Sequence, residues 1–128
     1  MAGSSVCIAS SDKVGSGKAF FNDAVTTAVQ VKGTAGQVYM IDVVNTTAAA
    51  AYLQIFFRPA ASVTLGTTAP DCVIRLLASV GKTIVFTVPI GFPPAASAAT
   101  QGSGLTIAGT TTPTGSTTAA LSVAAVYM

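Results

Sequence analysis

The chain of 128 residues has no histidine, no glutamate and no tryptophan, and it has only two cysteines. Charged residues make up 8% of it, against about 25% in an average globular protein. Without histidine, the chain lacks the ligands of an ordinary four-coordinate zinc site. A nucleophilic cysteine would also lack the histidine that usually activates it. The composition therefore predicts no metal site, no cofactor and no enzyme of these kinds.

All of the acidic side chains are aspartates. Paired carboxylates can cleave glycosides when their surroundings push the two pKa values apart. Here, however, Asp12 and Asp23 lie in or near the polar start of the chain, and Asp42 alternates within a strand-like segment. Asp71 follows Pro70 at a turn signal. We expect solvated or turn-capping roles for the four, and we predict no catalytic residue.

The two cysteines, Cys7 and Cys72, are far apart in the sequence. Their number allows a disulfide between them. Residues 1–13, however, lack the basic region and the apolar run of an export signal. Since disulfides persist mainly in oxidising compartments, we expect two reduced and mostly buried thiols.

The segment SDKVGSGKAFFN ends its glycine-rich part with Gly17 and Lys18, like the end of a phosphate-binding loop. That loop needs a first glycine five positions before Gly17 and a hydroxyl after the lysine. The chain has Asp12 and Ala19 at these two positions. The segment is therefore interpreted as a flexible Gly-Ser-Gly joint rather than a nucleotide site.

Apolar residues make up 51% of the chain, and the best candidate for a membrane-spanning segment covers residues 38–57. As a helix it could span a bilayer, but Asp42 near its centre would cost about 3 kcal/mol. Two strands and a turn explain this segment better, with Asn45-Thr46-Thr47 as turn residues rather than a glycosylation site. The net charge of +2 is too small for a nucleic-acid-binding surface. A composition this apolar and this poor in charge predicts that much of the protein's surface is buried against copies of the chain or against another protein.

Alternating apolar residues and frequent turn signals predict an antiparallel β-sandwich. In the segment 50–58, Leu53 and Ile55 should lie on one face of the strand and Gln54 and Phe56 on the other. The segment 82–90 alternates most clearly, with Ile84 inward and Val85 outward. We expect an extended N-terminal arm at residues 1–22 and a sandwich domain at 23–128. The predicted strands are 24–32, 38–45, 50–58, 71–78, 82–90, 105–110 and 120–128.

Four segments in this order carry a family resemblance: GQVYMIDVVNTTAAAAYLQIFF, SVTLGTTAPDCVIRLL, TIVFTVPIGFPPA and SGLTIAGTTTPTGSTTAALSVAAVYM. Their order and spacing resemble those of small virion structural proteins of tailed bacteriophages. The resemblance is closest to proteins that decorate or cement the capsid. It covers residues 25–128 and excludes the arm. Arg75 departs from it, because a wholly apolar strand is expected there.

The resemblance implies a jelly-roll-like sandwich and no enzymatic activity. It implies a protein on the outside of the capsid that is assembled in the host cytoplasm and bridges major capsid subunits. A dimer or trimer, and no nucleic-acid or membrane partner, is expected. Phe20 and Phe21, behind the Gly-Ser-Gly joint, are the candidate interface residues; alternatively, they hold the arm against its own domain.

Two other functions remain open from the sequence. The chain could be a tail, fibre or neck component, which the copy number per particle would distinguish from a capsid component. It could also be a carbohydrate-binding sandwich. Sugar sites use aromatic platforms, and the absence of tryptophan and the presence of only three tyrosines leave few of them.

Overall fold

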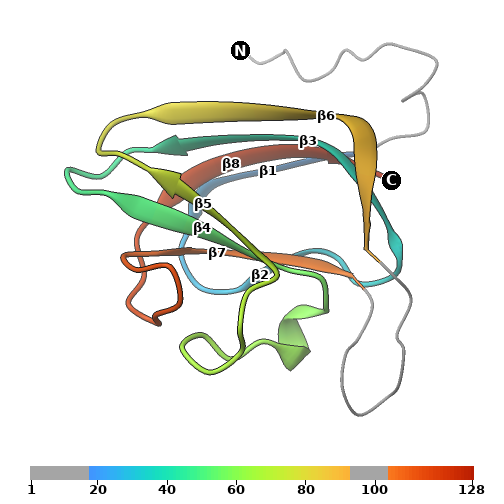
Figure 1. Cartoon of the computed structure of the whole chain (residues 1–128), viewed down its shortest axis with the longest axis horizontal. Helices are drawn as coiled ribbons and strands as arrows, with labels where there is room; N and C mark the ends of the chain where they lie inside the picture. The colour runs from blue at the N-terminus through green and yellow to red at the C-terminus, as the bar shows by residue number, and fades with distance from the viewer. Residues whose placement is uncertain (1–17, 93–103) are drawn as a thin grey trace.

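The computed structural model describes residues 18–92 and 104–128, with the backbone alone for residues 86–92. Eight β-strands and one short 3-10 helix form the regular structure of these residues (Figure 1). In chain order they are β1 (Lys18–Val25), β2 (Val29–Lys32), β3 (Gly36–Asn45), β4 (Ala51–Phe56), η3 (Ala60–Ser62), β5 (Cys72–Leu76), β6 (Gly81–Phe92), β7 (Leu105–Thr110) and β8 (Leu121–Tyr127). The predicted all-β class is confirmed.

The strands form two four-stranded sheets. The first sheet has the order β1-β8-β3-β6, and the second has the order β2-β7-β4-β5. Every pairing is antiparallel. The two sheets lie one above the other in Figure 1, with the first sheet uppermost. The predicted antiparallel pairing is therefore confirmed.

One hydrophobic core fills the space between the sheets, and both sheets contribute to it. In the first sheet, alternate residues of β8 point inward, namely Leu121, Val123 and Ala125. In the second sheet, Leu53 and Ile55 of β4 do the same, and they share one face, as their alternation predicted. Each fully buried Leu or Ile contributes about 2 kcal/mol of hydrophobic free energy.

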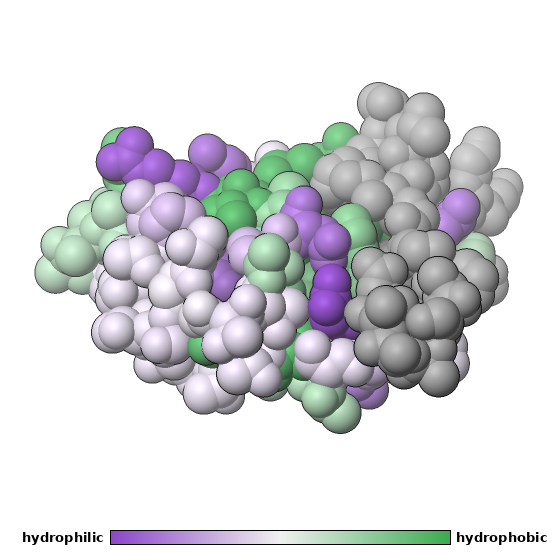
Figure 2. Space-filling view, turned by 60° about the horizontal axis from the view of Figure 1, so that its bottom comes forward, coloured by the Kyte–Doolittle hydropathy of each residue, from purple (hydrophilic) through white to green (hydrophobic). Residues whose placement is uncertain are grey.

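The outer face of the second sheet is covered by the chain's own loops; we call it the covered face. All six residues of β7 are buried, and so are Gln54 and Phe56 on β4. The β4–β5 connection (57–71) and the β7–β8 loop (111–120) lie on this side (Figures 1 and 2). The two loops meet there, because a Cβ on Gly66 would lie 3.1 Å from Ser116 Cβ.

Buried hydrogen bonds hold both loops against the covered face. The Gln54 amide nitrogen donates to Thr110 Oγ1 at 2.9 Å and to the carbonyl of Gly115 at 3.1 Å. Thr106 Oγ1 donates to the carbonyl of Arg58 at 2.8 Å. Gln54 and Phe56 were predicted to lie on the strand face opposite to Leu53 and Ile55, and they do. Both are nevertheless fully buried, and Gln54 bonds to a loop 61 residues further along the chain.

The turn between β3 and β4 is organised by Asn45. Its Oδ1 accepts from the Thr47 amide at 2.9 Å, and its Nδ2 donates to the Ala49 carbonyl at 2.8 Å. Asn45 is fully buried, so the sequence motif serves turn formation as predicted. The segment 38–57 accordingly contains two strands and a turn. No helix in the described part of the chain is long and apolar enough to cross a bilayer.

The start of the domain differs from the prediction. Residues 18–22, assigned to the arm, lie in β1, and the predicted strand 24–32 is divided between β1 and β2. The division occurs because β1 belongs to the first sheet and β2 to the second, so the chain changes sheets at residues 26–28. Residues 1–17, the rest of the predicted arm, lie outside the described residues.

Cys72 also differs from the prediction. It is the first residue of β5 and is exposed, whereas a buried thiol was expected. Its position at the end of a short edge strand leaves the side chain uncovered. Cys7 lies outside the described residues, so the reduced, buried thiol expected there stays a prediction.

The Gln54 amide should determine how tightly the β7–β8 loop is held. In Gln54→Leu, the Gly115 carbonyl loses its buried donor, so we expect a loss of roughly 1–3 kcal/mol in the free energy of unfolding. The Thr111 amide donates to the Thr117 carbonyl and the Ala119 amide to the Gly109 carbonyl, and these two bonds close the loop. Hydrogen exchange should accelerate at both amides. Chemical denaturation and exchange mass spectrometry measure the two effects.

The matched control is Gln30→Leu. The Gln30 side chain also bonds a loop, accepting from the Ala60 amide at 3.0 Å, but the residue is exposed. Loss of this exposed hydrogen bond should change the free energy of unfolding by less than about 0.5 kcal/mol. Equal effects of the two substitutions on stability would contradict the role assigned to the buried amide.

Candidate interaction surface

The outer face of the first sheet has no loop of the described residues packed over it; we call it the open face. The strand register places its residues in rows across the sheet. Ala19, Val126, Met40 and Val85 form one row, and Phe21, Ala124, Asp42 and Thr83 form the next. Val44 and Ser122 pair in a third row.

Apolar side chains dominate the open face, and several are strongly exposed. Phe21 is 67% exposed, Val85 is 66% exposed and Val44 is 37% exposed. Phe21 and Val85 lie on β1 and β6, the two edge strands of the sheet, with Val126 and Met40 between them. An exposed apolar surface that reaches from one edge strand of a sheet to the other is typical of a protein-binding site.

The few polar groups on the open face bond to one another. Thr83 Oγ1 donates to Asp42 Oδ1 at 2.7 Å, and Ser122 Oγ donates to Asp23 Oδ1 at 3.3 Å. The rows defined above contain no lysine or arginine. The Asp42 and Asp23 carboxylates have hydroxyl partners instead, and these hydrogen bonds lower the free-energy cost of covering the carboxylates with another protein.

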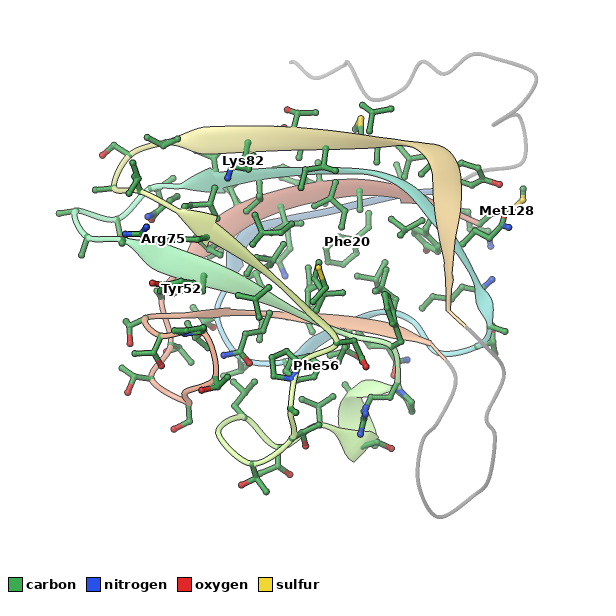
Figure 3. The ribbon with its side chains drawn as sticks, viewed as in Figure 1. Phe20, Tyr52, Phe56, Arg75, Lys82 and Met128 are labelled. Atoms are coloured by element: carbon green, nitrogen blue, oxygen red, sulfur yellow. The ribbon has the colours of Figure 1, made fainter. Side chains whose placement is uncertain are left out.

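The cationic groups of the described residues lie away from these rows. Lys82 pairs with the inward-facing Val43, and its Nζ donates to the Arg75 carbonyl at 3.3 Å. Figure 3 shows Lys82 and Arg75 near each other at the β5–β6 side of the molecule. The open face is therefore apolar and weakly acidic, while the cations lie at the edges and on the second sheet.

The two candidate interface residues differ in environment. Phe20 is partly buried and packs against the core between the sheets, where Figure 3 places it. Phe21 points to the opposite side, as successive strand residues do, and is exposed on the open face. Phe20 thus holds β1 to its own domain, and Phe21 is the one of the pair available to a partner.

An apolar cavity of about 70 Å³ lies between the two sheets. An apolar cavity of this kind has too few polar partners to hold water stably. It contains no acid, base or amide, so it offers packing space rather than a site for chemistry. Its lining residues are Val38, Ile41, Ile55, Phe57, Cys72, Ile74 and Ile84.

The aspartates of the described residues are dispersed. Asp71 accepts the Phe57 amide at 2.7 Å and so caps the end of the β4–β5 connection, as its position after Pro70 predicted. Asp42 and Asp23 bond to hydroxyls on the open face. Among residues 18–92 and 104–128, no group of three or more Cys or Asp side chains is placed to hold a metal ion.

Lys18, the lysine of the glycine-rich segment, is the first residue of β1. In a phosphate-binding loop the lysine begins a helix instead. The part of this segment that the structure describes therefore lacks the local fold that a nucleotide site requires, in agreement with the sequence-based interpretation.

Comparison with family models, with curated proteins and with solved structures found no match to this chain. The features of this chain that bear on its function are therefore the fold, the open face and the resemblance seen in the sequence.

Alanine substitutions should separate the two phenylalanines. Phe20→Ala removes a ring packed on the core and should lower the free energy of unfolding by roughly 1–3 kcal/mol, less than for a fully buried ring. Phe21→Ala should change it by less than about 0.5 kcal/mol, because the ring is exposed. Denaturant unfolding at low protein concentration measures both. Equal losses would mean that both rings anchor β1 to the domain.

Proposed function

We propose that this protein is a virion structural protein that decorates a phage capsid and stabilises it by bridging major capsid subunits. The observation that carries the proposal is the open face, an apolar and charge-poor surface whose rows cross the four strands of the first sheet. The resemblance of residues 25–128 to capsid decoration proteins supports the same function. The site of action is the exterior of the capsid, and the partner is the major capsid protein.

The strand pairing supports a jelly-roll sandwich. The first strand pairs with the last (β1 with β8), and the pairs β2–β7, β3–β6 and β4–β5 follow inward. This is the pairing of one long hairpin rolled into two sheets. Jelly rolls of eight strands occur in viral capsid proteins and in lectins. The fold is thus compatible with a virion protein but does not by itself identify one.

The difference between the two outer faces supports a docking role. The covered face is closed by its own loops and needs no partner. The open face leaves Phe21, Val85 and Val44 in water, and covering them yields about 25 cal/mol per Å² of apolar area. A protein that binds only the assembled shell stabilises it by mass action, and the symmetry of the shell repeats each contact.

A substitution on the open face tests this function. Val85→Lys introduces a charge at a 66% exposed position far from the β1 edge and should weaken binding to empty capsids about tenfold or more. Thr117→Lys, on an exposed loop of the covered side, is the control and should bind normally. Co-sedimentation of purified protein with capsids measures both. Equal binding of Val85→Lys and wild type would contradict docking through the open face.

The number of copies per particle distinguishes this proposal from a tail, fibre or neck role. A capsid-decorating protein should be present at hundreds of copies per virion, since the lattice repeats its site. Quantitative mass spectrometry of purified virions gives the number. A handful of copies would instead indicate a component of the tail or neck.

The arm can be tested with a deletion that respects the fold. Removing residues 1–22 would destroy β1, because that strand begins at Lys18. Removing residues 1–17 keeps every described strand. If the arm contributes to capsid binding, this deletion should abolish co-sedimentation while leaving the denaturation midpoint unchanged. Normal binding by the shortened protein would exclude a role for the arm.

A further inference from the structure

Each sheet of the described residues ends in two edge strands, β1 and β6 in the first and β2 and β5 in the second. An edge strand presents unpaired N–H and C=O groups, on which another strand can add. Proteins normally protect such edges with short strands, charged residues, prolines or bulges. The four edges of this protein differ in how well they are protected.

Three of the four edges carry such protection. β2 has four residues, ends in Lys32 and has a register shift against β7. β5 has five residues, with the exposed Arg75 among them. β6 is longer, but it contains Lys82 and Pro89, and a proline cannot donate to an added strand.

The fourth edge, β1, is the least protected of the four in the described part of the chain, because its charged residues, Lys18 and Asp23, lie near its ends. It has eight residues and no proline, and its register with β8 is regular from Lys18 to Asn22. Its irregularity comes only after Asn22. The middle of the strand carries the two phenylalanines, and Phe21 is 67% exposed there on the open face.

We propose that two copies of this protein pair antiparallel through β1, so that their first sheets join edge to edge about a two-fold axis. The proposal rests on the sheet edges and does not depend on the capsid role. The only charged residues of β1 are Lys18 near its start and Asp23 near its end. Antiparallel pairing brings the Lys18 end of one strand beside the Asp23 end of the other, whereas parallel pairing would bring like charges together.

The sandwich restricts the register of this pair. The open faces of both subunits must lie on the same side of the joined sheet, so paired residue numbers must add to an even number. In a pair centred on Phe20, Phe21 lies opposite the partner's Ala19. In a pair centred on Phe21, the ring meets the partner subunit's Phe21. Both registers cover Phe21 and join the two open faces into one apolar surface.

The test compares two lysine substitutions at equally exposed positions of one face. Sedimentation velocity over a hundredfold dilution series should show a monomer–dimer equilibrium for the wild-type protein. Phe21→Lys places two ammonium groups at the joined edge and should raise the dimer dissociation constant about tenfold or more. Val85→Lys, on the opposite edge strand, should leave it within about twofold of wild type.

Hydrogen exchange of the wild-type protein gives an independent measurement. Amides of β1 should exchange more slowly at high than at low protein concentration, while amides of β6 should not change. A monomer at every concentration, or unchanged β1 exchange in a dimer, would overturn the proposal. So would equal weakening by both lysine substitutions, which would indicate association through the open face rather than through the edge.

These outcomes are separable from those of the capsid experiment. A Val85→Lys protein that dimerises but fails to bind capsids supports both proposals. A wild-type protein that dimerises through β1 but never binds capsids supports the pairing and removes the capsid role. A wild-type protein that binds capsids as a monomer supports the capsid role and removes the pairing through β1.

Discussion

The buried amide of Gln54 fixes the asymmetry on which the rest of the molecule depends. It lies on the outer side of the second sheet, where a strand residue of a two-layer protein would ordinarily meet water. Its hydrogen bonds to Thr110 and Gly115 hold the β7–β8 loop over the outer side of the sheet. Once that loop and the β4–β5 connection are in place, β7 and most of β4 are buried on both faces.

This arrangement leaves one sheet with a surface of unusual composition. A chain with 8% charged residues has few groups to place at its surface, and those of the described residues lie mainly on the second sheet and the sheet edges. The open face is therefore built from alanine, valine, methionine and phenylalanine, with two aspartates held by hydroxyls. The low charge of the sequence predicted that some surface is buried against a partner, and in the structure the open face is the surface with this composition.

The sequence predicted the features that depend only on the local alternation of apolar and polar residues, such as which strand residues share a face. Ile84 was assigned to the core correctly, and Leu53 and Ile55 were correctly placed on one face of their strand, because strand side chains alternate. The burial of Gln54 was not predictable, because residues 110–115 cover it from more than fifty positions away. The strand β1 was missed because two adjacent phenylalanines break its alternation. Its pairing partner, β8, also lies about one hundred residues away.

For the candidate surface, the sequence identified Phe21 but not its setting. An aromatic residue behind a glycine-rich joint suggested a contact, and its exposure on the open face is compatible with that role. Val85 was predicted to point outward. Its place in one row with Ala19, Val126 and Met40 required the strand order, since these residues come from four separate segments.

The position of β8 also determines when the first sheet can form during synthesis. β8 follows the other strands in the sequence, yet it lies inside its sheet, between β1 and β3. While the ribosome is still making β7, β1 has no neighbour to pair with, and its phenylalanines remain in water. The first sheet can therefore be completed only after β8 has emerged, and a nascent chain leaves β1 without its partner strand until then.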